Sequence, residues 1–151
     1  MKPGGGRQEA GGAKAALEEA YRRALYCVRL AGGELVLRVG EYRSEHDLRL
    51  RSEAGVQSHW AIVTPCNPGS ARLEPAQNSA RLEQMAEDLR RHELRSAPSL
   101  NRDPLGRWPD EAGFLLCDAG PGVPEQLARQ FGQNAIVSAC LGEAPGLIWL
   151  A

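Results

Sequence analysis

The chain has 151 residues and a mass of 16.4 kDa, the size of one domain, and its 42% hydrophobic content is enough for a single core. Its 18 Lys and Arg residues balance 19 Asp and Glu residues, and a formal charge of -1 provides no overall attraction for nucleic acid. This composition therefore argues against a general nucleic-acid-binding protein. The start of the chain is polar and no apolar run approaches the length of a membrane span, so we expect a cytoplasmic protein without membrane association.

The N-terminal part of the chain changes character near residue 13. Residues 1–12 are rich in Gly and lack large apolar side chains, which predicts a disordered tail, and residues 13–151 are expected to form one domain. From Ala13 to Leu25, apolar residues recur at helical spacing. Residues 26–30 and 34–39 are short aliphatic runs on either side of a Gly-rich turn, and they predict a β-hairpin. The segment after this hairpin, residues 44–53, fits either a short helix or a polar loop.

The middle of the chain predicts a central strand followed by a long helix. Residues 58–64 are mostly apolar, and Pro65 and Pro68 stop the strand because proline removes a ladder donor. Residues 74–94 have helical periodicity, with an inner stripe of Leu82, Met85, Ala86 and Leu89. Asn78 lies one turn before Leu82 on the same stripe, so we expect its amide to point toward the sheet.

The C-terminal half alternates between loops and short elements. Three prolines and Gly106 within residues 96–111 predict a long ordered loop. A strand is expected at 113–117, a short helix at 124–131, and a closing hairpin from the runs 135–140 and 147–150. These elements predict a single α+β or α/β domain, a mixed β-sheet with helices packed on it and with β-hairpins at its N-terminal and C-terminal ends.

Polar residues gather near the expected ends of these elements. Buried amides are costly unless they form hydrogen bonds, so either the fold or a ligand must require them. Asn67 is the leading candidate, because open sheets place ligand groups just past the ends of central strands. An Asx-turn, in which the Asn67 side chain bonds its own backbone, explains the presence of Asn at this position equally well. The expected ligand-binding set is Thr64, Asn67, Ser70, Asn78, Arg81, Trp108, Gln133 and Asn134.

Glu111 is the candidate catalytic residue, as a general acid or base. It lies close to Trp108, which could desolvate the carboxylate and raise its pKa. A salt bridge from Glu111 to Arg81 or Arg107 that holds the loop in place is the simpler alternative. The His residues are scattered and the Cys residues never form Cys-x-x-Cys, so no metal site is expected. No glycine-rich cofactor fingerprint is present, and no cofactor is expected.

The order of these motifs resembles a bacterial family, the domain-of-unknown-function family number three-two-nine-three. The similarity is carried by Trp60 to Thr64 followed by Asn67-Pro68 and Ser70, by Asn78 with Arg81, by Gly106-Arg107-Trp108 with Glu111, and by Phe131 to Ala135. It extends over about residues 20–150. The resemblance implies a small cytoplasmic bacterial protein, and it brings no activity, cofactor or partner.

Three functions fit these residues. The first is binding of a polar small molecule, for example a nucleotide-like compound, through the Asn, Gln and Arg side chains. The second is a hydrolase or transferase with Glu111 as general base and Arg81 holding an anionic group. The third is a protein-interaction module in which the amides only satisfy backbone groups of the loops. The sequence leaves the oligomeric state open.

Overall fold

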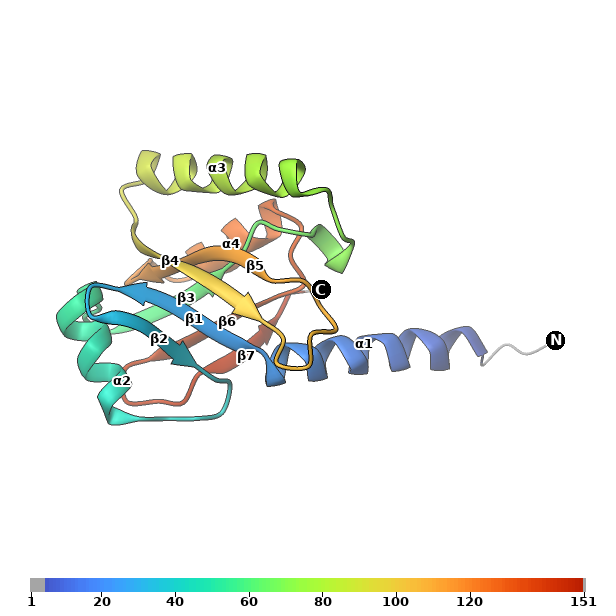
Figure 1. The fold of residues 1–151 in the computed structure, drawn as a ribbon, viewed down its shortest axis with the longest axis horizontal. Coiled ribbons are helices and arrows are strands. Elements are labelled where there is room, and N and C mark those ends of the chain that lie inside the picture. Colours follow the sequence, from blue (N-terminus) through green and yellow to red (C-terminus); the bar gives the residue numbers. More distant parts are fainter. Residues whose placement is uncertain (1–4, 151) are drawn as a thin grey trace.

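The computed structural model describes residues 5–150, and it describes side chains from residue 12 onwards. Figure 1 shows a curled sheet of seven strands with helices around it. The strand order is β2-β1-β4-β5-β3-β6-β7, and every neighbouring pair is antiparallel. The strands are β1 (Leu25–Leu30), β2 (Gly33–Leu37), β3 (His59–Val63), β4 (Arg95–Arg102), β5 (Glu111–Cys117), β6 (Ala135–Cys140) and β7 (Gly146–Trp149).

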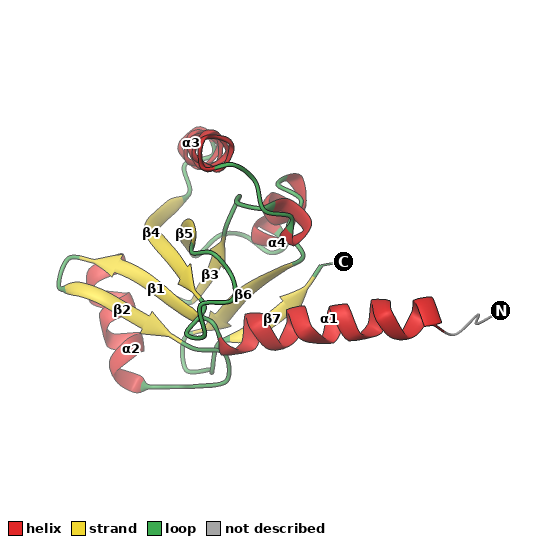
Figure 2. Ribbon diagram, turned by 45° about the vertical axis from the view of Figure 1, so that its right-hand side comes forward, coloured by secondary structure: helices red, strands yellow, loops and turns green. Residues whose placement is uncertain are grey.

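Four α-helices connect and flank the strands. They are α1 (Gly5–Arg23), α2 (Ser44–Arg49), which continues into a π-helical turn (Leu50–Ala54), α3 (Pro75–Arg91) and α4 (Val123–Gln130). A 3₁₀ turn (Pro68–Ser70) precedes α3. In Figure 2, α3 and α4 lie on one side of the sheet and α2 on the other, while α1 projects beyond the strands.

The predicted disordered tail overlaps the start of α1. Its residues 1–4 lie outside the described residues, and the expected domain boundary at residue 13 stays a prediction. Helix α3 begins where its sequence indicates. Pro75 occupies the first turn, where a missing N–H costs nothing, and Glu74 and Gln77 form a capping box. The expected inner stripe buries Met85 and Leu89.

Both faces of the sheet are covered, as β3 shows most clearly. Trp60 and Ile62 point into a core cluster made of residues from β1 to β6 with Leu50 and Val56. Ala61 and Val63 point the other way, into a cluster under α3 and α4. We call the first surface the Trp60 face. A strand buried on both faces agrees with the prediction of 58–64 as a central strand.

The structure confirms the α+β class, the single sheet covered by helices, and both terminal hairpins. In place of the expected mixture of parallel and antiparallel strands, all pairings are antiparallel. The larger difference is β4, because the predicted loop over 96–111 contains most of an eight-residue strand between β1 and β5.

Pro98 explains why β4 is hard to recognise, since proline is rare in the middle of sheets. The register between β1 and β4 ends at Ser99, the residue that follows Pro98 in the chain. Pro98 is paired with Phe114 of β5, and no β1 residue lies opposite it in the register. At this position β4 is therefore an edge strand toward β1, where a missing N–H is tolerated.

Gly113 allows the closest approach between β5 and the end of β3. A Cβ atom at this position would overlap the carbonyl oxygen of Val63 and would lie 3.0 Å from Thr64 Cα. Backbone atoms, unlike a flexible side chain, cannot move aside cheaply. The absence of a side chain at Gly113 therefore fixes the segment that leads from β3 to Asn67.

We expect Gly113→Ala to destabilise the protein by about 3 kcal/mol, because the added methyl group forces β3 and β5 apart. Urea unfolding measures this loss. Gly120→Ala is the control, because its Cβ would meet only the Val123 side chain, at 3.6 Å. A Gly113→Ala protein as stable as the control would contradict the close approach.

Candidate functional site

Asn67 is the centre of a hydrogen-bond network just past the end of β3. Its backbone is left-handed, with φ 48° and ψ 62°, a conformation that Asn tolerates better than most residues. Its Oδ1 accepts hydrogen bonds from Asn78 Nδ2 and Leu73 N, both at 2.9 Å. Its backbone N–H donates to Asn78 Oδ1 at 3.0 Å, and its Nδ2 donates to Glu111 Oε2 at 2.9 Å. One amide thus joins the end of β3, the start of α3 and the start of β5.

A second set of polar side chains lies behind this network and binds backbone carbonyls. Arg81 donates from Nε to Pro65 O at 2.6 Å, and its Nη2 donates to Phe131 O. Gln133 Nε2 donates to Cys66 O at 2.9 Å and to Phe131 O at 3.2 Å. These contacts tie the segment after β3 to the end of α4. Arg81 and Gln133 therefore hold two loops together.

Thr64, Ser70 and Asn134 make further contacts around the same segment. Thr64 Oγ1 donates to Ala112 O at 2.7 Å and accepts from Cys66 N at 3.1 Å. Asn134 Nδ2 donates to Ser70 Oγ at 3.1 Å, and the hydroxyl of Tyr21 lies 3.3 Å from the same oxygen. The residues expected to bind a ligand thus surround residues 64–70, and most of them bind one another or the backbone.

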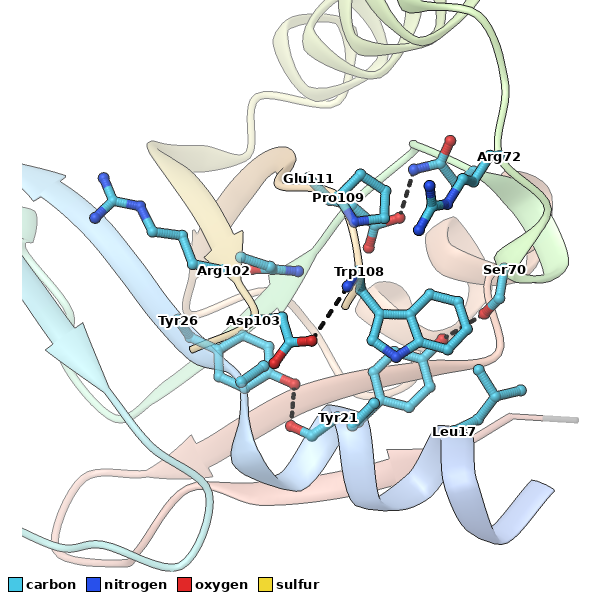
Figure 3. Close-up of a pocket in the computed structure, with 14 residues that line it drawn as sticks. Leu17, Tyr21, Tyr26, Ser70, Arg72, Arg102, Asp103, Trp108, Pro109 and Glu111 are labelled. Atoms are coloured by element: carbon cyan, nitrogen blue, oxygen red, sulfur yellow. Dashed lines mark hydrogen bonds between the residues drawn. The ribbon is translucent and has the colours of Figure 1, made fainter. Parts of the chain in front are cut away.

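A pocket of about 60 Å³ opens beside Asn67 and Glu111 (Figure 3). A cavity of this size holds several water molecules or one small planar group. Its apolar wall comes from α1 and includes Leu17, Ala20 and Tyr21. The remaining wall contains Ala24, Tyr26, Asn67, Ser70, Arg72, Asn101, Arg102, Asp103, Trp108, Pro109 and Glu111.

Asp103 organises the loop that carries Trp108. Its carboxylate accepts backbone N–H groups of Leu105, Arg107 and Trp108 at 3.0, 2.9 and 3.1 Å, and it pairs with Arg23 Nε at 3.1 Å. The hydrogen bond from Arg23, together with those from the loop, lowers the pKa of Asp103 to about 2 against the effect of desolvation. Figure 3 shows Asp103 reaching the backbone of Trp108. The loop is therefore fixed both within itself and to the end of α1.

Glu111 is half-buried at the first position of β5. Burial raises the pKa of Glu111 above the ordinary range of a glutamate, and the hydrogen bond from Asn67 only partly offsets this effect. No ion pair in the described part of the chain includes Glu111, so the predicted salt bridge to Arg81 or Arg107 does not form there. The carboxylate lies instead at the wall of the pocket, with one amide donor.

Tyr26 and Asn101 are pocket residues that the sequence did not reveal. Tyr26 is opposite Asn101 in the β1–β4 register, and Asn101 is opposite Glu111 in the β4–β5 register. Burial, followed by the charges of Tyr21 and Glu111, raises the pKa of the Tyr26 hydroxyl far above its ordinary value. If residues 95–102 had been predicted as a strand between β1 and β5, Tyr26, Asn101 and Glu111 would have been expected to lie side by side. The alternation of Ala97, Ser99 and Asn101 on one face is the signal.

The structure separates the predicted site residues into three groups. Asn67, Ser70, Trp108 and Glu111 line the pocket, and Asn78 supports it through Asn67. Thr64 and Gln133 line a smaller cavity that shares Tyr21, Tyr26 and Asn101 with the pocket. Arg81 and Asn134 line neither. The roles assigned to these residues stay predictions, although their gathering around residues 64–70 is a property of the fold.

A wider groove of about 340 Å³ lies on the other side of Asn67, toward α3. Arg72 and Pro109 stand between the two spaces, and Arg72 Nη2 donates to Arg107 O at 3.0 Å. Cys66 lines the groove, but burial raises the pKa of its thiol, which keeps it protonated. The groove thus contains no activated nucleophile among the described side chains.

Within residues 12–150, no group of three or more His, Cys, Asp or Glu side chains lies close enough to bind a metal ion. None of the helices over the described range has the length and hydropathy needed to span a bilayer.

The fold and the pocket together define a class: an α+β domain with a curled antiparallel sheet and, at one end of it, a small and mostly apolar pocket that contains the Glu111 carboxylate and two amides. Residues 63–136 match the family model described as "Protein of unknown function (DUF3293)". The family resemblance of the sequence motifs is thereby confirmed over this segment, which is shorter than the expected 20–150. The segment contains Asn67, Asn101, Trp108 and Glu111, whereas Tyr21 and Tyr26 lie before it. No curated protein and no solved structure matches the chain.

Asn78→Ala should destabilise the protein by about 2 kcal/mol, because it removes both hydrogen bonds to Asn67 and leaves a buried backbone N–H without its partner. Ser79→Ala, one residue further along α3 and exposed, is the control. Chemical denaturation compares the two proteins. Equal stability would show that Asn67 keeps its conformation without Asn78.

Glu111→Gln should raise the melting temperature at neutral pH. Because the pKa of Glu111 is raised in the folded protein, the stability that this group contributes is present below the unfolded pKa of about 4.3 and is lost as the pH rises through the folded pKa. Gln keeps an acceptor for Asn67 and carries no charge to desolvate. The difference in melting temperature between variant and wild type should therefore be small in acid and grow toward neutral pH. A variant that is less stable than wild type at neutral pH would indicate a structural ion pair.

Proposed function

We propose that this chain binds a small polar molecule in the pocket formed by Asn67, Trp108, Glu111 and the end of α1. The observation that carries the proposal is the Glu111 carboxylate, which is desolvated at the pocket wall and held in position by Asn67. A structural role would be served by a neutral side chain, so a desolvated carboxylate at the pocket wall favours a binding partner.

The geometry around the carboxylate supports binding. Asn67 is itself fixed by Asn78 and Leu73, so the direction of its Nδ2–H toward Glu111 is determined before any ligand arrives. Trp108 is positioned by the hydrogen bond from its backbone N–H to Asp103. Preorganised polar groups of this kind reduce the entropy that binding costs. Aromatic and apolar side chains on the facing wall are typical of small-molecule sites.

An enzyme is the second candidate, and the raised pKa of Glu111 in a pocket is the observation that favours it. A carboxylate with a raised pKa is suited to accept a proton near neutral pH. The anion-holding role that the sequence suggested for Arg81 is not supported, because Arg81 is used by Pro65 O and Phe131 O outside the pocket. A hydrolase or transferase would have to rely on Glu111 with Asn67 and Tyr26.

The protein-interaction alternative is supported by the hydrogen bonds that the amides form within the chain. The large hydrophobic side chains exposed on the described surface are Tyr42, Leu48, Leu105 and Ile148, on a loop, α2, the β4–β5 loop and β7. Because they belong to separate elements, they give weaker support to an interaction surface than the pocket gives to a ligand. A cytoplasmic location and a bacterial origin belong to the proposal as expectations from the sequence.

A thermal-shift screen of nucleotides, nucleobases, amines and amino acids tests the proposal. A ligand should raise the melting temperature of the wild type, since it binds only the folded state. The shift should be lost in Trp108→Ala, which removes one side of the pocket, and kept in Leu105→Ala, which removes an exposed side chain of the same loop. Asn67→Ala should also lose the shift if it folds. Stabilisation that survives in Trp108→Ala would place the ligand elsewhere.

A further inference from the structure

Three polar side chains form one row across adjacent strands at the end of the Trp60 face. Tyr26 of β1 lies opposite Asn101 of β4, which lies opposite Glu111 of β5. Side chains at directly opposed positions point to the same face, with Cβ atoms about 5 Å apart. All three line the pocket. We call them the acceptor row, for the reason that follows.

Most of the free hydrogen-bonding capacity of this row consists of acceptors, and Asn101 Nδ2 is the donor that remains. Asn101 Oδ1 is buried and accepts no hydrogen bond from the described residues. The hydroxyl proton of Tyr26 is used on the carbonyl oxygen of Tyr21 at 2.6 Å, which leaves the oxygen lone pairs. Glu111 accepts from Asn67 through Oε2, and a carboxylate accepts several hydrogen bonds in all. A partner that fits must therefore supply donors.

The neighbouring cationic side chains are used elsewhere. Arg23 pairs with Asp103 at 3.1 Å, and Arg72 donates to Arg107 O at 3.0 Å. Arg102 pairs with Glu34 at 3.3 Å and points away from the other labelled residues in Figure 3. No arginine of the described chain neutralises Glu111. The Glu111 carboxylate thus forms no ion pair and keeps lone pairs for a ligand, beside the Arg72 guanidinium that also lines the pocket.

The rest of the pocket suits a flat group. Tyr21 and Trp108 contribute aromatic rings and Leu17 and Ala20 contribute methyl groups. A delocalised cation is attracted to aromatic faces, and it is desolvated more easily than a compact ammonium group. The volume of about 60 Å³ admits the head of such a ligand and excludes a large ring system.

We propose that the acceptor row recognises a planar group with paired N–H donors, of the amidinium or guanidinium type, with Glu111 taking both donors of one edge and Asn101 Oδ1 taking a third. Two parallel N–H···O bonds to one carboxylate form the strongest arrangement of this kind. The inference rests on the proposed function, and it narrows the ligand from any polar molecule to one of donor chemistry. A 2-aminoimidazolium ring presents the same edge, a ring N–H beside an amino N–H, and is the alternative source of it.

The test is a titration of the ¹⁵N-labelled protein with small probes, followed through the side-chain resonances of Asn67, Asn101 and Trp108. Acetamidinium and 2-aminoimidazolium are the donor probes, while acetate and inorganic phosphate are anions of similar size. The donor probes should shift these resonances in the wild type, and the response to acetamidinium should be at least tenfold weaker in Glu111→Gln. Glu87→Gln is the control variant and should respond like the wild type, since Glu87 pairs with Arg90 on the exposed side of α3 and lines none of the spaces described above.

The outcomes separate this inference from the proposed function. A response to acetamidinium identifies the amidinium source, and a response to 2-aminoimidazolium alone identifies the heteroaromatic source of the same donor edge. Binding of acetate or phosphate at these resonances, or of a screened ligand without N–H donors, would overturn the inference and leave small-molecule binding intact. The inference would also be overturned if neither donor probe shifted the resonances. If no compound of the thermal-shift screen shifts these resonances, the proposed function is wrong as well.

Discussion

The left-handed conformation of Asn67 is the constraint on which the site depends. At φ 48° the chain leaves β3 sharply, and the carboxamide, 5% exposed with the rest of the residue, turns inward between α3 and β5. A left-handed backbone is unfavourable for most residues by about 1 kcal/mol or more. The hydrogen bonds to Asn78, Leu73 and Glu111 offset this cost. Gly113 completes the arrangement, because a side chain there would displace the end of β3.

Much of the fold follows from the sequence, because most elements carry a strong local signal. The hairpins have glycine turns and aliphatic strands, and α3 has a proline at its start and a regular apolar stripe. β4 lacks such a signal, since Arg95–Arg102 contains Pro98, two Ser and one Asn, and its place between β1 and β5 depends on non-local pairing. Tertiary context, which local propensity does not report, decides such strands.

The site was predictable in part, because some of its residues carry a local sequence signal and others are brought in only by strand pairing. Asn67, Asn78 and Glu111 follow from turn chemistry and from their places at element ends, and the structure brings them into direct contact. Gln133 carries the same carboxamide group as Asn67 and Asn78, yet it binds backbone carbonyls of the two neighbouring loops, as Arg81 also does. A sequence does not distinguish an amide that serves a loop from one that serves a cavity, since both are buried and both are hydrogen-bonded. Asn101 and Tyr26 could be found only through the register of β4, which the sequence did not indicate.

The two walls of the pocket have separate origins along the chain. Asn67, Asn101 and Glu111 belong to the segment 63–136, whereas Leu17, Ala20 and Tyr21 belong to α1. The amides and the carboxylate of the pocket thus come from one stretch of the chain, and the apolar wall on α1 comes from another. Substitutions along one helix can enlarge or narrow the space while the carboxylate and its supporting amides stay unchanged. For the proposed binding role, substitutions in α1 are therefore a way to change the size of the molecule that enters while Asn67, Asn101 and Glu111 stay the same, and a protein engineer can exploit this independence.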